Sequence, residues 1–557
     1  MQALRRLSLY THTIRYLRPV QLSGRVWHRL YRPAPDLAPA PARRAPDAAW
    51  ESPARREPSM VAPSGWHFLG ETHEVRDAAD WDNPAWSRLW RYNLHYFDDL
   101  NARDSDARLV WHAQWVAQWL AANPPARGSG WEPYPTSLRM VNWIKWALEG
   151  DAVGEGRLDA RALASLAVQA RWLARRLEVH LLGNHLFANA KALFCAGLFF
   201  SGPEAQTWLD TAGRLLQREI GEQILADGGQ FERSTMYHAL AVEDMLDLLN
   251  IARAYRAALP PLWRDLSDAW PARIGSMLGW LDSMSHPDGE IAFFNDAAFG
   301  IAPTRAQLHA YALRLGLSPA AGVRAGLTHL RDSGYIRCQA GEAVALLDIA
   351  PVGPDYLPGH AHADTLSFEL SVQGQRVIVN GGTSTYAPGA ERERQRGTAA
   401  HSTVVIGDNN SSETWSSFRV ARRARPFGLR IDEIAGAMQV AASHDGYRRL
   451  PGAPVHRRTW RMDARHLEVA DMIEGGSGAA ATAYFHLHPA IEVRALDQHG
   501  CELHWPGCAR PLRVREPGGA LALRRATWHP RFGAAEPAQS LTVELRGGAS
   551  TVNLEWA

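Results

Sequence analysis

Residues 111–119 read WHAQWVAQW, and their spacing decides the first half of the fold. Trp111, Trp115 and Trp119 recur every four residues, which places three indole rings on one face of a helix. Similar apolar stripes occupy residues 136–149, 158–180, 184–200, 204–226, 237–258 and 262–285. The stripes show no fixed-period sequence repeat, which disfavours an open solenoid. We therefore predict an N-terminal (α/α) toroid, an aromatic-rich incomplete helical barrel with a central cleft, over residues 63–325.

After residue 325 the pattern changes to short alternating or β-branched runs that are separated by Gly, Pro, Asn and Asp turns. The runs are Ala343–Ile349, Leu366–Val372, Arg376–Val379, Thr403–Ile406, His466–Met472, Ala481–Leu487, Leu541–Leu545 and Thr551–Leu554. Short strands at this spacing are typical of a β-sandwich. The predicted fold is multidomain α+β, in which the toroid is followed by a C-terminal antiparallel β-sandwich over residues 326–557.

The composition agrees with two soluble globular domains. A chain of 557 residues is longer than one hydrophobic core usually serves. The net charge of +2 offers no field that favours nucleic acid as a partner, and no apolar run is long enough for a membrane span. Four scattered cysteines form no disulfide framework. Only Lys145 and Lys191 are lysines, and this excess of Arg indicates genome base composition rather than a function.

Residues 1–62 are predicted to form a basic N-terminal arm and a linker. Seven arginines and no acidic residue lie in the first 35 positions, without the apolar stretch of a secretory signal. The Pro/Ala-rich stretch from Pro33 to Pro46 favours an extended linker. We expect the arm to pack on the main body; a helix on a membrane surface is the alternative.

Three polar clusters are candidates for chemistry. His360, His362 and Asp364 would point to one side of an extended segment, where they could bind a metal or an anion or could hold the loop as a structural pair. His401 opens a later strand and could join them. Other motifs are missing: the sequence has no Walker loop, no GxGxxG with an acidic partner, no GxSxG elbow and no HExxH helix.

The other two clusters each open an apolar-striped helix. Gly183-Asn184-His185 begins the helix that runs to Phe200, and we expect Asn184 as its N-cap. A helix N-terminus is suited to receiving an anion such as a carboxylate. Residues 232–238 read ERSTMYH, in which Tyr237 and His238 form an acid/base set or simply pack as aromatics.

Taken together, these segments and residues 381–402 resemble the heparinase II/III family of polysaccharide lyases. The resemblance spans about residues 80–550 and implies the same layout of toroid and sandwich. It also implies an active cleft between the two domains and a uronic-acid-containing polysaccharide that is cut by β-elimination. Such elimination removes the proton at C5 of the uronate, so its carboxylate has to be neutralised or hydrogen-bonded.

The resemblance assigns roles to individual residues. Asn184 would hold the uronate carboxylate, and His185 would assist it or act as base. Tyr237 would be the general acid for the leaving oxygen, and the base as well if its pKa is lowered. His360 would line the cleft from the sandwich side. The substrate contacts would come from Glu232, Arg233, His238 and Tyr386.

Some relatives bind a structural zinc through a histidine, an aspartate and a second histidine. His362 and His401 match the histidine positions, whereas Asn380 stands where the family pattern has Asp. An amide oxygen is a weaker ligand for zinc than a carboxylate, so the sequence leaves zinc binding open. The chemistry itself requires no cofactor.

The leading hypothesis is a lyase that acts on an acidic polysaccharide, either a bacterial exopolysaccharide or a glycosaminoglycan-like polymer. A uronate C5-epimerase on the same scaffold and a non-catalytic glycan-binding protein of a polysaccharide export system are the alternatives, and a glycoside hydrolase with two carboxylates is weaker. The resemblance implies a periplasmic or cell-envelope location, although a cytoplasmic one stays open. The polymer, the cleavage mode and the oligomeric state do not follow from the sequence.

Overall fold

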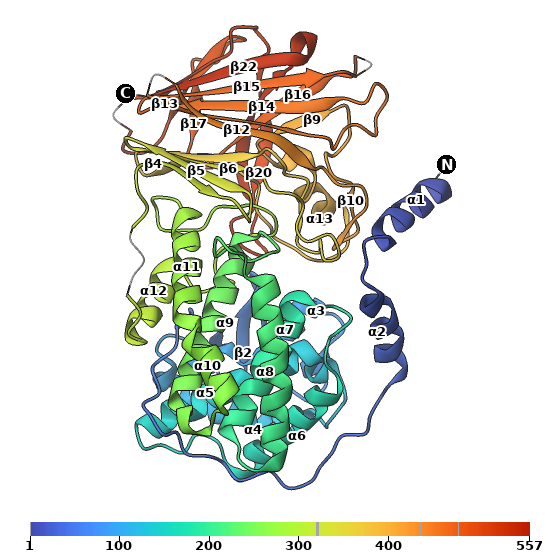
Figure 1. Ribbon diagram of the computed structural model, residues 1–557, viewed down its shortest axis with the longest axis vertical. Helices are drawn as coiled ribbons and strands as arrows, with labels where there is room; N and C mark the ends of the chain where they lie inside the picture. Colours follow the sequence, from blue (N-terminus) through green and yellow to red (C-terminus); the bar gives the residue numbers. More distant parts are fainter. Residues whose placement is uncertain (1, 319–321, 435, 477, 509, 557) are drawn as a thin grey trace.

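The structure is a computed structural model that describes residues 2–318, 322–434, 436–476, 478–508 and 510–556 (Figure 1). A helical half and a strand-rich half are stacked along the long axis of the molecule. The N-terminal helices are α1 (Gln2–Ile14) and α2 (Pro19–Leu30), and the helical half comprises α3 (Arg88–Tyr96), α4 (Leu109–Ala122), α5 (Pro133–Ala152), α6 (Ala160–Arg175), α7 (Gly183–Phe199), α8 (Pro203–Gln223), α9 (Thr235–Ala254), α10 (Pro261–Asp268), α11 (Trp270–Ser283) and α12 (Arg305–Arg314).

The tryptophan stripe of α4 forms part of the helical core as predicted. Trp115 and Trp119 are buried, and Trp111 is half-buried at the edge of the same cluster. Helix α7 is apolar around most of its circumference, because α5, α8 and α9 surround it. A helix that is hydrophobic on all sides belongs in the interior of a domain.

The predicted helix 262–285 is in fact two helices. Helix α10 ends at Asp268 and α11 begins at Trp270, with Pro271 in its first turn. Proline has no backbone N–H, and its ring clashes with the carbonyl four residues earlier, so one continuous helix cannot pass through this position.

A three-stranded antiparallel sheet in residues 60–74 was not predicted. It consists of β1 (Met60–Ala62), β2 (Gly65–Phe68) and β3 (Glu71–Glu74). Trp66 of β2 is buried against Trp115 of α4, with ring centroids 5.4 Å apart. The sheet therefore covers the tryptophan face of α4.

The strand-rich half is a sandwich of two antiparallel sheets, which confirms the predicted fold class. One sheet has the order β12-β13-β14-β15-β22-β19-β18-β17, and the other β20-β21-β16-β8-β7-β6-β5-β4, with β9 paired to β16. The bounds are β4 (Gly326–Leu330), β5 (Tyr335–Ala340), β6 (Ala343–Asp348), β7 (Phe368–Val372), β8 (Gln375–Val379), β9 (Val404–Ile406), β10 (Thr414–Trp415), β11 (Arg419–Val420), β12 (Pro426–Ile434), β13 (Ala437–His444), β14 (Val455–Met462), β15 (His466–Glu474), β16 (Ala481–Leu487), β17 (Glu492–Arg494), β18 (Gly500–His504), β19 (Leu512–Arg515), β20 (Leu521–Trp528), β21 (Glu536–Glu544) and β22 (Ala549–Glu555), with helix α13 (Ala390–Gln395) between β8 and β9.

The core of the sandwich lies between these sheets. Phe368 of β7 packs against Trp460 of β14 and Phe485 of β16, with centroids 6.5 and 6.1 Å apart. Burial alternates along β14 and β15, as expected for strands with one face on the core.

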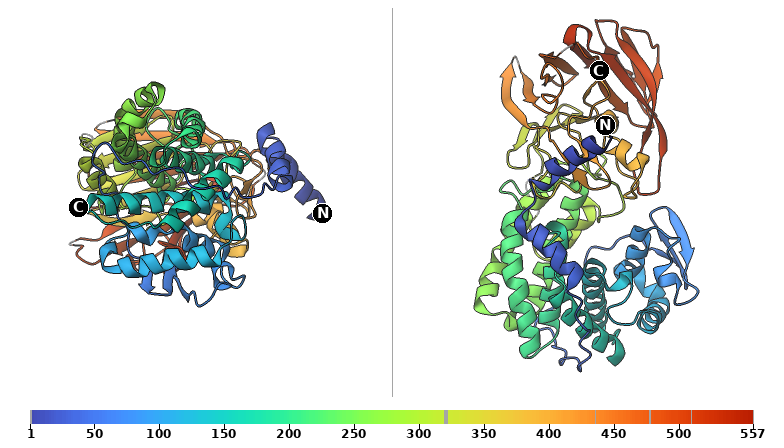
Figure 2. Two further views of the ribbon diagram at one scale, coloured as in Figure 1. Left: turned by 90° about the horizontal axis from the view of Figure 1, so that it is seen from below. Right: turned by 90° about the vertical axis from the view of Figure 1, so that its right-hand side faces the viewer.

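The N-terminal arm, residues 2–30, lies along one flank of the molecule and reaches both halves (Figure 2). Its helices α1 and α2 stand outside the main body, and an extended linker leads from them around the helical half. Residues 44 and 47 of this linker donate backbone hydrogen bonds to Phe199 and Ala254. Across the described residues we find no helix with both the length and the apolar character that crossing a membrane requires.

Candidate active site

A cleft of about 2610 Å³ lies between the two halves. Six of the predicted site residues line it, and they come from both sides. Asn184, His185, Glu232 and Tyr237 belong to the helical half, and His360 and Tyr386 lie in loops of the strand-rich half. Close packing at the starts of α7 and α9 holds the side chains of the helical half in place, and the buried carboxylate of Asp296 holds His360.

The start of α7 differs from the prediction that Asn184 is its N-cap. The helix begins at Gly183, and Leu182 is the capping residue. Leu182 and Gly183 both have positive φ, 63° and 54°. Glycine suits the positive φ of this turn, and a Cβ atom on Gly183 would lie 2.3 Å from Cδ2 of Leu357 and would have to push the end of that side chain aside. This turn puts Asn184 and His185 in the first turn of α7, where both reach the cleft.

His185 is oriented by Glu178, a residue that the sequence did not single out. Its Nδ1 lies 3.2 Å from Oε1 of Glu178, whose other oxygen accepts a hydrogen bond from Asn189. Burial lowers the pKa of His185, but the charge and hydrogen bond of Glu178, together with the charges of Glu232 and Glu132, raise that pKa above its ordinary value. The imidazolium form of His185 is thereby stabilised. The Asn184 carboxamide has no hydrogen-bond partner among the described residues and is free to meet a ligand.

Tyr237 lies at the start of α9, which Ser234 caps by accepting a hydrogen bond from the Tyr237 backbone N–H. Its hydroxyl group is 3.1 Å from that of Tyr386, and its ring stacks on His360 with centroids 3.8 Å apart. Burial, followed by the neighbouring Tyr386, raises the pKa of Tyr237 well above its usual range. The Tyr237 hydroxyl group is therefore protonated at neutral pH.

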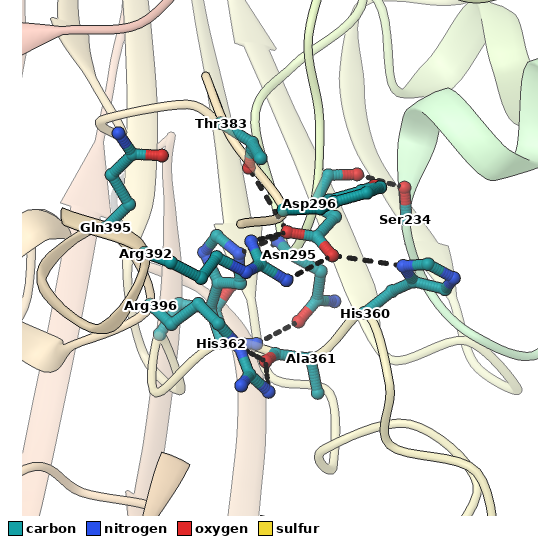
Figure 3. A network of polar contacts seen from close by, with 12 residues as sticks. Ser234, Asn295, Asp296, His360, Ala361, His362, Thr383, Arg392, Gln395 and Arg396 are labelled. Carbon is teal, nitrogen blue, oxygen red and sulfur yellow. Dashed lines mark hydrogen bonds and ion pairs between the residues drawn. The ribbon is translucent and has the colours of Figure 1, made fainter. Parts of the chain in front are cut away.

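Asp296 is the centre of the polar network that holds His360 (Figure 3). Nδ1 of His360 lies 3.0 Å from Oδ2 of Asp296, and Arg392 binds both carboxylate oxygens. Burial raises the pKa of Asp296, but the charge of Arg392 and the hydrogen bonds of its neighbours lower it to well below its ordinary value. Because an ionised carboxylate only accepts hydrogen bonds, Nδ1 of His360 is the donor in this contact.

Nε2 of His360 faces Glu232, whose Oε2 lies 3.7 Å away. Glu232 is buried at the wall of the cleft and accepts hydrogen bonds from Gln230 and from the backbone of Asn184. Burial raises its pKa above the ordinary value of a glutamate. This carboxyl group links the starts of α7 and α9 to His360.

Two predicted substrate contacts lie away from the cleft. Both ring nitrogens of His238 bind backbone groups, the N–H of Gln230 and the carbonyl of Met277, and the side chain is fully buried. Arg233 turns to the domain junction, where its Nε donates to the carbonyl of Ser333. These two predictions are corrected accordingly: His238 holds the start of α9, and Arg233 joins the two halves.

The segment from His360 to Asp364 is not part of a strand. His360 and His362 still converge, because each binds a different oxygen of Asp296. Asp364 instead accepts a hydrogen bond from the backbone of Asn295.

The predicted metal ligands are only partly arranged for a metal. Nδ1 of His362 and Nε2 of His401 face each other at 3.2 Å. The Asn380 amide is engaged elsewhere, since its oxygen accepts from the Ser402 backbone and its nitrogen donates to Ser367. The described residues contain no group of three or more His, Cys, Asp or Glu side chains placed to hold a metal ion. The Asp296 carboxylate beside His362 is already bound by His360 and Arg392, so two imidazoles and an engaged amide do not fit a structural zinc site.

The only two lysines of the sequence meet in a buried cluster in the wall of the cleft. Lys145 of α5 and Lys191 of α7 both bind Oδ2 of Asp247, at 2.9 and 2.7 Å. Lys191 also binds Asp244 of α9, at 2.7 Å. The cluster therefore joins the three helices two turns below Asn184 and Tyr237.

Comparisons with known proteins agree with this architecture. The family model described as "Heparinase II/III N-terminus" matches residues 77–312, and "Heparinase II/III-like, C-terminal" matches residues 322–557. The crystal structure of heparinase III superimposes with a TM-score of 0.68 at 18% identity and covers 88% of this chain and 80% of that one, which shows a shared fold.

Two relatives have names of different kinds, one for an enzyme and one for a localisation. A heparin-sulfate lyase of Bacteroides stercoris is 27% identical over 42% of this chain, and the match spans only 37% of that protein. FtsZ-localized protein C of Caulobacter vibrioides is 27% identical over 74% of this chain and 72% of its own length. Since the two family models together account for both halves of the molecule, this chain belongs to the heparinase II/III family.

Proposed function

We propose that this protein is a polysaccharide lyase that cleaves a uronic-acid-containing polysaccharide by β-elimination. The convergence of Asn184, His185, Tyr237 and His360 on one cleft carries this proposal. A cleft between two domains, lined by a few convergent polar groups with shifted pKa values, is typical of an active site. The lyase names of the relatives support the reaction class.

The first task in the reaction is to neutralise the uronate carboxylate. In the proposed role, the Asn184 amide donates a hydrogen bond to it, and the His185 imidazolium supplies the opposite charge. Glu178 keeps His185 in this charged form. Stabilising the negative charge that develops on the carboxylate after proton loss lowers the barrier to C5–H cleavage.

The remaining steps use side chains of this chain alone. Nε2 of His360 accepts the C5 proton, since Asp296 holds the other ring nitrogen in its protonated form. The C5–H electron pair forms the C4=C5 double bond, and the C4–O4 bond breaks. The Tyr237 hydroxyl gives its proton to the departing O4, which leaves as a hydroxyl group. No cofactor takes part in this sequence.

A non-catalytic glycan-binding role is the second candidate. The match to FtsZ-localized protein C extends over more of this chain than the match to the heparin-sulfate lyase does, and that relative is named for its localisation and not for a reaction. The C5-epimerase alternative shares the proton abstraction but returns the proton to the other face of the sugar without breaking the C4–O4 bond. The proposal includes an acidic polysaccharide as the substrate and the cell envelope as the location of the protein.

Ultraviolet absorbance tests the proposal. Purified protein is mixed with a panel of uronic-acid polysaccharides, with Tyr237→Phe as the matched variant. A lyase produces the conjugated unsaturated-uronate signal on at least one polymer, and the variant loses it while still binding that polymer. Equal affinity of both proteins with no signal on any bound polymer would favour the non-catalytic role.

A further inference from the structure

The N-terminal arm forms one wall of the cleft. Gln21 of α2 donates a hydrogen bond to the carbonyl of Tyr356, at 3.0 Å, four residues before His360. Gly24 packs directly on His180, just ahead of α7, where an added Cβ atom would lie 2.9 Å from the Cβ atom of His180. The arm therefore contacts both halves of the molecule, close in sequence to the proposed catalytic side chains (Figure 2).

Three arginines of the arm face the cleft from one side of α2. Arg25, Arg29 and Arg32 all line the cleft, and all three are exposed. Spacings of four and three residues place them in one stripe along α2 and just beyond its end. Among the residues that the structure describes, none of these three side chains forms a hydrogen bond or an ion pair. Their guanidinium groups are therefore available to a ligand in the cleft.

The wall around these arginines is rich in positive charge. The nearby carboxylates already have basic partners: Glu222 binds Arg18, Glu178 binds His185, Glu132 binds Arg88 and Asp36 binds Arg175. Burial and then the charge of Arg32 lower the pKa of Arg176, which lines the same cleft. Burial, followed by His28 and Arg25, lowers the pKa of His180 to about 4. Like charges that lie close together without counter-charges favour the binding of an anion.

We propose that Arg25, Arg29 and Arg32, here called the arm subsite, bind the anionic groups of sugar units next to the one that is cleaved. A guanidinium group donates parallel hydrogen bonds to a carboxylate or to a similar oxyanion such as a sulfate ester. Three of them in a stripe suit a polymer with repeated anionic groups. The inference rests on the acidic polysaccharide of the proposed function but not on its cleavage. The matched family ranges begin at residue 77, so the family assigns no role to the arm.

Binding of the full chain to two acidic polymers tests the arm subsite. One is a polyuronate, whose only anionic groups are carboxylates, and the other is heparan sulfate, which carries sulfates as well. The triple variant Arg25→Gln, Arg29→Gln, Arg32→Gln should raise the Kd about tenfold, since exposed ion pairs each contribute modestly. High salt should reduce the difference between this variant and the wild type. The polymer with the larger loss identifies the anionic group that the arginines recognise.

The matched control is the triple variant Arg6→Gln, Arg15→Gln, Arg465→Gln. It removes the same charge from exposed arginines outside the cleft, two of them in the arm, and should bind as the wild type does. On a polymer that is cleaved, the arm-subsite variant should raise KM and leave kcat unchanged, because the arm subsite touches no reacting atom. Thermal unfolding of both triple variants checks that they fold.

Three outcomes would overturn the proposal. They are no binding of the wild type to either polymer, equal Kd values for the two triple variants, and binding of a neutral glucan that is as tight as binding of the acidic polymers. Binding without cleavage, weakened in the arm-subsite variant, would support the subsite and contradict the lyase reaction. The arm subsite and the lyase reaction are therefore contradicted by different results.

Discussion

The ring of Tyr237 stacks on the ring of His360, with centroids 3.8 Å apart, and this contact joins the two halves of the molecule inside the cleft. Tyr237 belongs to helix α9, whereas His360 lies in a loop that precedes β7. The proton donor and the proton acceptor of the proposed reaction are therefore neighbours only when both halves are packed together. The network around Asp296 holds them there, since its backbone carbonyl accepts a hydrogen bond from Ser234 and its carboxylate binds His360.

Replacing Glu178 with Gln should move the alkaline limb of the pH profile. The pKa of His185 is raised by Glu178, so the proposed activity that needs the imidazolium is present below that pKa and is lost as the pH rises through it. Without the carboxylate, the loss begins at lower pH. The measurement is kcat/KM as a function of pH, with a polymer that the wild-type protein cleaves as the substrate. Glu149→Gln, which changes a carboxylate that binds Trp50 and Arg55 away from the cleft, is the control and should leave the limb in place.

Gly183→Ala should damage both stability and turnover. An alanine there meets an unfavourable positive φ and the side chain of Leu357, and relief of that clash displaces Asn184 and His185. We expect a loss of about 1–3 kcal/mol in the free energy of unfolding. Gly202→Ala is the matched control, because Gly202 also has positive φ ahead of a helix but nothing lies within 4 Å of the added Cβ. Equal turnover in both variants would contradict the role given to the Gly183 turn.

Much of the fold could be predicted because the spacing of apolar residues along the sequence indicates which face of a helix or strand is buried. The strand Ala481–Leu487 was predicted with the bounds that the structure has, since it is central in its sheet and its apolar residues stand out. Strand β12 was missed because it lies at a sheet edge, exposed along most of its length, and is held by backbone pairing with β13 rather than by an apolar pattern.

The site could be predicted only where its residues are near one another in the sequence. Asn184, His185 and Tyr237 open apolar helices, and this local signal located them. Asp296 and Arg392 were missed because they are 96 residues apart and meet only through the packing of the two halves. Glu178 is just outside the start of α7 and has no motif of its own, so only the contact with His185 identifies it.

Lys191→Met should destabilise the helical half. The change removes one cation from the buried cluster and leaves Asp244 and Asp247 with less compensating charge. Breaking a buried ion pair in this way costs about 3–5 kcal/mol, which urea unfolding would measure. Arg256→Met, which breaks an exposed ion pair with Asp268, is the control and should change the unfolding free energy far less. Equal effects would show that the buried cluster has no special role.

Treatment with a metal chelator should leave the thermal unfolding midpoint unchanged. His362 is held by Asp296 and His401 through hydrogen bonds, and the Asn380 amide is bound to Ser367 and Ser402 rather than turned toward them. The comparison is a melting curve before and after dialysis against the chelator, together with the zinc content of the untreated protein. A drop of several degrees that zinc restores would show that these residues do bind a metal.

The most direct test of the central claim is the fate of solvent oxygen during cleavage. The protein is incubated with a uronic-acid polymer that it binds, in water enriched in ¹⁸O. The masses of the products are then measured by mass spectrometry. β-Elimination predicts fragments whose masses sum to that of the parent, with one double bond and no ¹⁸O at the cleavage site. Incorporation of one ¹⁸O per cleaved bond would show hydrolysis and would contradict the account, as would an intact bound polymer.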